Sequence, residues 1–260
     1  MTRENFPVRI DPPVDKDIRW LYEDERMIVI DKPADLPVHS SGSYVRNTLD
    51  WLLKRYRPGN TIHLVSRLDR ETSGLVLVAK DPQMAAILGK TPKRKYYHVL
   101  VRGRFPEGRW CASGTIQRSN EPPVYSMRHL VGARLTTHLP PLPKDRGAAT
   151  WFERIGEGPW PDTTLLSAEL VTGRTHQIRA SLCSLGWPVV GDKIYGGDPE
   201  CFLRFRDDLL TDADRAHLRL PNQALRAVKL EFLGKTFHTV RPPWTTQATG
   251  PTKHAPKHTC

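Results

Sequence analysis

The sequence predicts an α+β fold with a mostly antiparallel sheet. Strand-like segments dominate the 260 residues, and helix-like segments are interspersed among them. The longest apolar runs, Met27–Ile30 and Gly74–Ala79, have the length of strands and fall far short of a membrane span. There is no internal repeat, so a solenoid or propeller is not expected.

The chain is expected to begin with an extended arm followed by a buried strand. Residues 1–19 combine three prolines with mixed charge, which predicts the arm. Met27–Asp31 is a short apolar strand that Lys32 and Pro33 end, and residues 35–42 form the next loop.

A helix is predicted over Asn47–Tyr56, where apolar residues recur at helical spacing. Asn47 or Thr48 is the candidate N-cap, and Pro58 with Gly59 marks the end.

The next segments predict a turn between two strands. His63–Arg67 alternates weakly and leads into the turn Leu68–Gly74, and Leu75–Lys80 is a buried strand. The Asp-Pro pair at 81–82 opens a short helix over Met84–Leu88.

The second half continues with strands and fewer helices. Strands are predicted at Tyr96–Val101, Cys111–Gln117, Ala148–Arg154, Thr163–Val171, Leu225–Leu233 and Lys235–Val240. A helix over Thr175–Leu185 is stopped by Gly186 and Pro188, and Leu203–Leu220 is charged and partly helical. Residues 132–147, with three prolines, are expected to be irregular.

The positive charge is local. The chain carries 39 basic and 28 acidic residues, a net charge of +11, and arginine supplies 26 of the basic residues. Residues 88–134 alone hold ten basic and two acidic side chains, and residues 235–260 hold four basic and none acidic. A local excess favours a polyanion partner, with Lys93, Arg94 and Lys95 as candidate contacts. The alternative is that this run is a solvated loop.

Several function classes lack support. The four cysteines form no CxxC pair, which disfavours a disulfide framework or a zinc site and favours the reducing cytoplasm. The first residues contain no apolar segment, so no secretory signal is expected. Motifs for phosphate-loop, nicotinamide, serine-hydrolase and zinc-protease chemistry are missing from the sequence.

One candidate catalytic group is Asp69, in the polar turn between two apolar strands. The alternative is that it only stabilises the turn. However, Arg67 and Arg70 flank it and would keep it ionised, although a carboxylate on a basic surface repels phosphate. Nucleophilic or acid–base work on a nucleic-acid component would explain the placement.

A second candidate segment runs from Thr172 to Arg179. Gly173 permits a tight turn, and Arg174 and His176 lie at the start of the predicted helix, where anions can bind. An ordinary capped helix is the alternative.

Five segments in order resemble the RluA-like family of pseudouridine synthases. They span about residues 20–235 and are Asp31–His39, Arg67–Leu75, Lys95–Tyr97, Gly173–Arg179 and Leu185–Gly196. The resemblance implies a central mixed sheet with flanking helices and an RNA-binding cleft. It also implies isomerisation of uridine to pseudouridine without a cofactor.

The resemblance also implies roles for individual residues. Asp69 matches the catalytic aspartate, and Arg67 matches the arginine that fills the gap left by the flipped base. Tyr97 matches the catalytic tyrosine that stacks on the uracil and can help proton transfer. Ile178 and Arg179 match the pair that packs the base and pairs with the aspartate. Whether the aspartate forms an ester with the sugar or assists loss of the uracil anion stays open.

The chain departs from the family pattern at two places. Ser66 stands where the family usually has histidine, which affects a contact behind the site rather than Asp69 itself. Residues 103–147 match no family segment and are expected to be an insertion. The first 20 residues leave no room for the family's additional S4-type RNA-binding module, so the basic segment is expected to hold the RNA instead.

The expected organisation is an arm at 1–19, a catalytic domain at 20–241 and a disordered basic tail at 242–260. The protein is expected to be a cytoplasmic monomer that acts on ribosomal or transfer RNA. Neither a membrane nor a small-molecule cofactor is expected to take part. Residues 38–48 are similar to family members that act on tRNA. The rival hypothesis is a catalytically silent RNA-binding protein on the same fold. A DNA-binding protein is disfavoured because no recognition-helix pattern occurs.

Overall fold

The computed structural model describes residues 11–57, 61–119, 124, 127–240, 242 and 244. The strands are β1 (Arg19–Glu23), β2 (Met27–Lys32), β3 (His63–Leu64), β4 (Ser73–Ala79), β5 (Arg94–Arg102), β6 (Arg109–Arg118), β7 (Arg128–Thr136), β8 (Gly147–Glu157), β9 (Thr163–Leu170), β10 (Leu225–Phe232) and β11 (Lys235–His238). The helices are α1 (Leu49–Tyr56), α2 (Pro82–Lys90), α3 (Gln177–Ser184), α4 (Cys201–Arg206) and α5 (Asp212–Leu218). None of these helices is long and apolar enough to cross a membrane.

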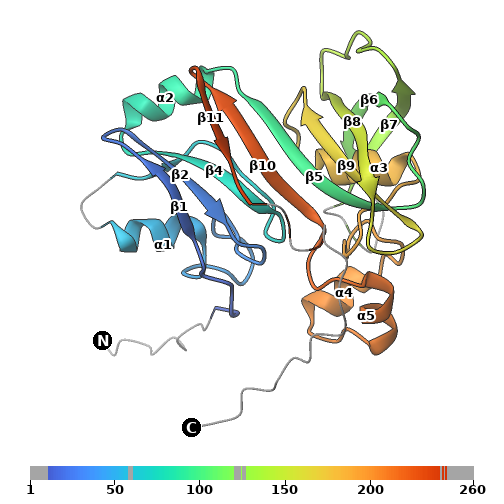
Figure 1. Ribbon diagram of the computed structural model, residues 1–260. Helices are drawn as coiled ribbons and strands as arrows, with labels where there is room; N and C mark the ends of the chain where they lie inside the picture. The colour runs from blue at the N-terminus through green and yellow to red at the C-terminus, as the bar shows by residue number, and fades with distance from the viewer. Residues whose placement is uncertain are drawn as a thin grey trace.

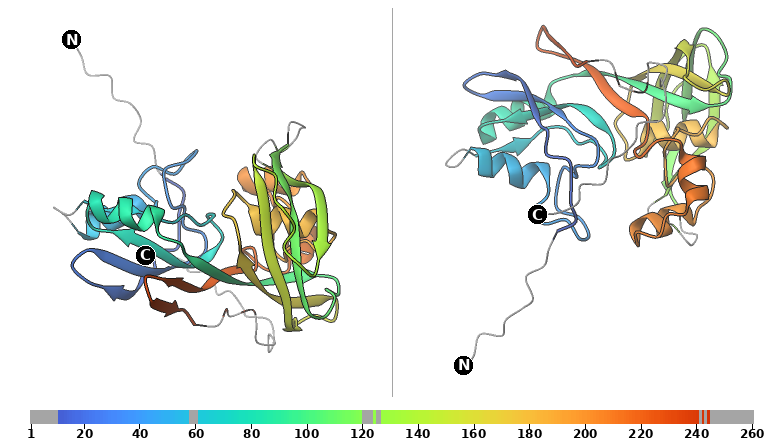
Figure 2. Two further views of the ribbon diagram at one scale, coloured as in Figure 1. Left: turned by 90° about the horizontal axis from the view of Figure 1, so that it is seen from above. Right: turned by 60° about the horizontal axis from the view of Figure 1, so that its bottom comes forward.

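The described strands form one continuous sheet in the order β1-β2-β4-β10-β5-β9-β8-β6-β7, with β3 also paired to β4 and β11 to β10. The pairing of β4 with β10 is parallel, and the other pairings are antiparallel. The predicted α+β class with a mixed, mostly antiparallel sheet is therefore confirmed. Helices α1 and α2 lie beside the β1–β4 part, whereas α3 lies beside the β6–β9 part (Figures 1 and 2).

The predicted strands and helices occur close to their expected positions. Thr48 is the N-cap of α1, where its hydroxyl accepts a hydrogen bond from the N–H of Trp51, and Asp81 caps α2 in the same way. The charged segment Leu203–Leu220 contains both α4 and α5.

One prediction is wrong in part. Residues 132–136 are not irregular, because they complete β7, which pairs with β6 at the far edge of the sheet. The alternation in this strand is weak, since only Leu130 is buried among its nine residues, and the neighbouring prolines concealed it. Residues 11–18 have no regular structure, as expected, whereas the tail prediction lies outside the described residues except at Pro242 and Trp244.

The parallel pairing depends on Gly74, which has a φ of +110°. A Cβ atom at this position would lie 2.2 Å from the carbonyl oxygen of Ala227 in β10. Because the glycine follows the Asp69 turn directly, this close approach joins the two halves of the sheet beside the candidate catalytic group.

We predict that Gly74→Ala lowers the free energy of unfolding by about 3 kcal/mol or more, through backbone strain and overpacking. Gly89→Ala is the matched control, because nothing lies within 4 Å of a Cβ there, and helix propensity should add about 0.5–1 kcal/mol of stability. Urea unfolding measures both. An equal, small effect of the two substitutions would contradict this account.

Candidate active site

Asp69 lies in the loop between β3 and β4. The N–H of Thr72 donates to the Asp69 carbonyl at 3.1 Å, which closes the turn around it. Behind the turn, the buried hydroxyl of Ser66 accepts a hydrogen bond from the Leu77 N–H at 3.1 Å. The serine at this position therefore ties the loop to β4.

Lys32 connects the Asp69 loop to the loop that follows β2 through hydrogen bonds. Its ammonium group is fully buried and donates to the carbonyls of Pro33, Leu36 and Arg70 at 2.8, 2.9 and 3.0 Å. Since Arg70 follows Asp69 directly, these bonds hold the backbone beside the carboxylate in one conformation.

The Asp69 carboxylate pairs with Arg179 from α3. Arg179 Nη1 donates to Asp69 Oδ2 at 2.7 Å, while Nε and Nη2 donate to the two carboxylate oxygens of Asp192 at 2.6 and 2.9 Å. The guanidinium is 5% exposed, Asp192 is fully buried, and Asp69 keeps 27% exposure. One buried cation is thus shared between a structural carboxylate and a solvent-facing one.

The pairing determines the protonation state of Asp69. Burial is the largest single influence and would raise its pKa, but the Arg179 charge and the hydrogen bonds from Arg179 and Gln223 together hold the pKa below its ordinary value. Asp192 behaves in the same way, helped by the N–H groups of Ile194 and Tyr195, which donate to it. The two carboxylates in turn overcome the desolvation of Arg179 and raise its pKa. Asp69 is therefore ionised at neutral pH.

His176 lies on the other side of Asp69, with its Nε2 3.8 Å from Asp69 Oδ1. The residue precedes α3 in a left-handed conformation with φ of 56°, which histidine tolerates better than most residues. Burial, followed by the nearby charge of Arg179, lowers its pKa to about 4. The imidazole is therefore neutral.

A hydrogen-bond chain favours one tautomer of His176. The N–H of Arg128 donates to the Tyr195 hydroxyl at 2.8 Å, and this hydroxyl lies 3.0 Å from His176 Nδ1. Because the phenol oxygen already accepts from Arg128, the favoured arrangement has the phenol donating its proton to Nδ1. The remaining imidazole proton is then on Nε2, the nitrogen nearer to Asp69.

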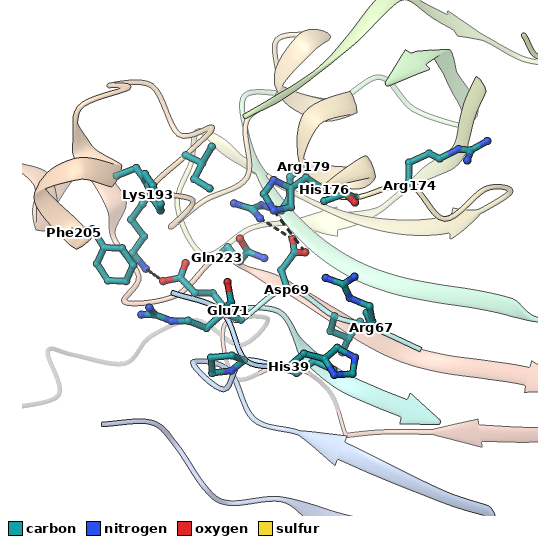
Figure 3. A pocket seen from close by; sticks show the side chains of 18 of the residues that line it. His39, Arg67, Asp69, Glu71, Arg174, His176, Arg179, Lys193, Phe205 and Gln223 are labelled. Carbon is teal, nitrogen blue, oxygen red and sulfur yellow. Dashed lines mark hydrogen bonds and ion pairs between the residues drawn. The ribbon is translucent and has the colours of Figure 1, made fainter. Parts of the chain in front are cut away.

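Two adjoining cavities, of about 320 and 540 Å³, meet at Asp69 (Figure 3 shows the larger). Residues lining both are Arg67, Leu68, Asp69, Gly173, Arg174, His176 and Arg179. The smaller cavity adds Lys95, Tyr97 and Ile178. Tyr97 is 6% exposed, and burial with the Asp69 charge raises its pKa. We define the smaller one as the Tyr97 cavity.

The predicted site residues divide into those that reach the cavities and those that do not. Arg67 and Arg174 are exposed at the rim, and within the described part of the chain neither forms a salt bridge. Lys93 instead donates to the carbonyls of Leu88 and Thr91, the last turn of α2 and its C-cap. Arg94 pairs with acidic residues of β9 and β10.

Sequence reasoning did not assign several residues of the site. Three of them, Asp192, Lys193 and Tyr195, belong to the family-like segment Leu185–Gly196. The signal that could have identified them is the cluster of Gly, Asp, Lys and Tyr in this short loop. Lys193 forms a buried salt bridge of 2.7 Å with Glu71. Gln223 gave no signal; its amide donates to the Thr72 hydroxyl at 2.5 Å.

The geometry agrees with the comparisons to known proteins. Residues 26–184 match the family model described as RNA pseudouridylate synthase. The chain belongs to this family, and the resemblance to the RluA-like pseudouridine synthases is confirmed.

Individual relatives support the assignment. The chain is 34% identical over 192 residues to a tRNA pseudouridine(31) synthase of Saccharomyces cerevisiae, covering 67% of this chain and 45% of the relative. It is 35% identical to the ribosomal large subunit pseudouridine synthase D of Nitrosomonas europaea, covering 83% of this chain and 58% of the relative. The chain thus spans about half the length of these curated relatives.

A solved structure supports the fold. Human RNA pseudouridylate synthase domain containing 1 superposes with a TM-score of 0.64 at 22% identity, covering 90% of this chain and 86% of that one.

We predict that Asp192→Ala lowers the free energy of unfolding by about 3–5 kcal/mol, because it leaves the buried Arg179 fork without its bidentate partner. Asp198→Ala is the control: Asp198 is exposed, and Arg204 keeps its bonds to Asp214. Denaturant unfolding compares them, and equal losses in the two variants would contradict a special role for Asp192.

Proposed function

We propose that the protein is an RNA pseudouridine synthase that isomerises uridines in transfer or ribosomal RNA. The observation that carries this proposal is one carboxylate, Asp69, which Arg179 holds ionised at the mouth of the Tyr97 cavity. Family membership supports the reaction type, and the local geometry supports the residue roles.

The reaction replaces the N1–C1′ bond of uridine by a C5–C1′ bond. Asp69 either attacks C1′ or stabilises the positive charge that develops there as the uracil leaves with the N1–C1′ electrons. The base then turns so that C5 bonds to C1′, C5 loses its proton, and N1 gains one. Atoms and electrons balance within the nucleoside, so the step requires no redox partner.

The Tyr97 cavity fits the detached base. Tyr97 offers an aromatic face and Ile178 an apolar contact, and both are buried beside Asp69. The raised pKa of Tyr97 keeps its hydroxyl protonated, so a proton leaving C5 can pass to the phenol only if the phenol's own proton moves on. Its main role in this proposal is therefore to stack on and position the base.

The target uridine must leave its base stack before it can enter this cavity. Flipping costs a few kcal/mol, which stacking on Tyr97 and insertion of Arg67 into the vacated space would offset in part. Arg67 is exposed at the cavity rim, where such insertion is sterically open.

Contacts to the RNA backbone come from the rim and from the basic segment. Arg67 and Arg174 are exposed, the Arg174 side chain uses only its Nε among the described residues, in a hydrogen bond to the Gly147 carbonyl, and Lys95 lines the Tyr97 cavity. Lys93 and Arg94 are the weaker candidates among the proposed contacts, since each already has partners within the chain. We place the enzyme in the cytoplasm as a monomer, with residues 20–241 as its catalytic domain.

We predict that Asp69→Asn reduces pseudouridine formation by about 10⁴-fold or more while RNA binding persists. The test RNA is a synthetic tRNA anticodon stem–loop spanning positions 31 and 32, because two relatives carry these positions in their names. Nucleoside chromatography measures the product, and filter binding measures affinity.

The control for this variant is Asp50→Asn, since Asp50 has the same 27% side-chain exposure and lies on α1 paired with Lys54. It should leave the product yield unchanged. Full activity of Asp69→Asn would overturn the assignment of Asp69, whereas RNA binding by the wild-type chain without any product would favour the silent RNA-binding protein.

We predict that neither Asp69 nor His176 contributes a midpoint to the single-turnover rate on saturating RNA between about pH 5.5 and 8. A group that does titrate in this range is buried Lys32, whose pKa burial lowers to about 7. The pKa of Asp69 lies below its ordinary value of 3.8, so the carboxylate is lost only when the pH falls through that lower value. His176, with a pKa of about 4, is neutral across the same range. A rate that falls as the pH drops through about 6.5 would show that His176 titrates near its ordinary value or that the pKa of Asp69 is raised, and would contradict this account.

We predict that pseudouridine mapping of total RNA from a deletion strain, compared with its parent, shows loss of specific sites in tRNA or rRNA. Reintroduction of the wild-type chain should restore those sites, and reintroduction of the Asp69→Asn chain should not. An unchanged pseudouridine map would contradict the proposed function.

A further inference from the structure

The larger cavity extends from Asp69 away from Tyr97, towards α4. Residues that line it and not the Tyr97 cavity include His39, Arg70, Glu71, Lys193, Phe202 and Phe205 (Figure 3). We name this part the α4 cavity. The reaction itself needs space for one base only, which the Tyr97 cavity provides, so the function of the α4 cavity is unassigned.

The aromatic wall of the α4 cavity does not belong to the hydrophobic core. Phe202 and Phe205 are three residues apart on α4, so they share one face of the helix, and both are half-buried. Neither packs into any of the three core clusters of the described structure. Two phenylalanines that line a cavity without filling a core are available to a ligand.

Two cations hold Phe205 in place. The guanidinium of Arg70 lies 4.9 Å from the ring centroid, and Lys193 Nζ lies 4.7 Å from it. Each cation is also paired with a carboxylate, Arg70 with Asp35 and Lys193 with Glu71, both at 2.7 Å. Because their charges are neutralised, they position the ring more than they attract phosphate.

The rim of the two cavities carries positive charge that could pair with phosphate groups. Arg67 and Arg174 are exposed where the two cavities meet, and neither has a salt-bridge partner within the described ranges. An aromatic wall beside exposed guanidinium groups without a carboxylate partner in the described chain suits single-stranded nucleic acid, in which bases stack on the rings and phosphates meet the arginines. A nucleotide fits both parts, whereas an apolar ligand would leave the arginines unused.

The position of α4 indicates a role in substrate selection. Residues 201–206 lie outside the five segments that resemble the family, the last of which ends at Gly196, whereas Asp69, Tyr97 and Arg179 lie within those segments. A wall contributed by residues outside those segments can differ between relatives without altering the chemistry.

We propose that the α4 cavity binds the base of an unpaired nucleotide adjacent to the target uridine, with Phe205 as its stacking surface. The inference rests on the proposed function for the identity of the base in the Tyr97 cavity. Because both cavities open at Asp69, successive nucleotides of one strand can occupy them together.

The test measures the affinity of the anticodon stem–loop for chains carrying Asp69→Asn, in which the RNA stays unconverted. Adding Phe205→Ala should weaken binding about tenfold, and Phe205→Trp should restore it. Phe205→Leu keeps apolar volume without a ring, so it should weaken binding as Phe205→Ala does, while circular dichroism shows that the chain is still folded. Leu209→Ala, which removes an exposed leucine just beyond α4, is the control.

The decisive comparison uses stem–loops with one base removed on the 5′ or 3′ side of position 31 or 32. On one of these RNAs the effect of Phe205→Ala should disappear, because the stacking partner is missing. The proposal would be overturned if Phe205→Ala lowered the affinity equally for every RNA, or did not lower it for the intact RNA.

The two proposals fail separately. If the wild-type chain forms pseudouridine but the effect of Phe205→Ala does not depend on the missing base, only the proposed role of the α4 cavity is refuted. If that dependence is seen but the wild-type chain forms no pseudouridine, only the proposed function is refuted.

Discussion

The structure around the site depends on one buried guanidinium. A charge removed from water is stable only if carboxylates and good geometry compensate for the lost hydration. Arg179 meets this condition with two aspartates, Asp192 behind it and Asp69 in front. Asp192 is itself held by backbone N–H groups of the following residues, so the cation has a fixed orientation. Asp69 is the one partner that solvent and substrate can reach.

This ion pair joins parts of the chain that are far apart in sequence. Asp69 follows β3 and Arg179 belongs to α3, 110 residues later. The sheet brings them together, because the parallel pairing at Gly74 places β10 beside β4, and β10 continues through β5 and β9 to the half of the sheet that carries α3. The mixed sheet is thus what allows one carboxylate to meet one guanidinium at the mouth of the Tyr97 cavity.

The sequence predicted the fold well where local pattern determines structure, and the residues proposed to react, Asp69, Tyr97 and Arg179, line one cavity. Apolar runs identified β2 and β4, and Thr48, one of the two candidate caps, is the N-cap of α1. It failed at β7, whose exposed edge gives no clear alternation. Long-range contacts could not be predicted either, because the pairings of Asp192 and the cation contacts of Phe205 depend on side chains from separate segments of the chain. Likewise, the charge of Lys93 and Arg94 indicated RNA contacts, but charge counts do not show partners within the chain.

The most direct test of this account is the pKa of the Asp69 carboxylate, measured by NMR of carbon-13-labelled aspartate across a pH titration. The account predicts a pKa below the ordinary 3.8 in the wild-type chain. It also predicts a change in that value in Asp192→Asn, because Arg179 loses its second anion and its fixed orientation. A wild-type pKa above the ordinary value, with no response to Asp192→Asn, would contradict the claim that the Arg179 fork holds Asp69 ionised and in place.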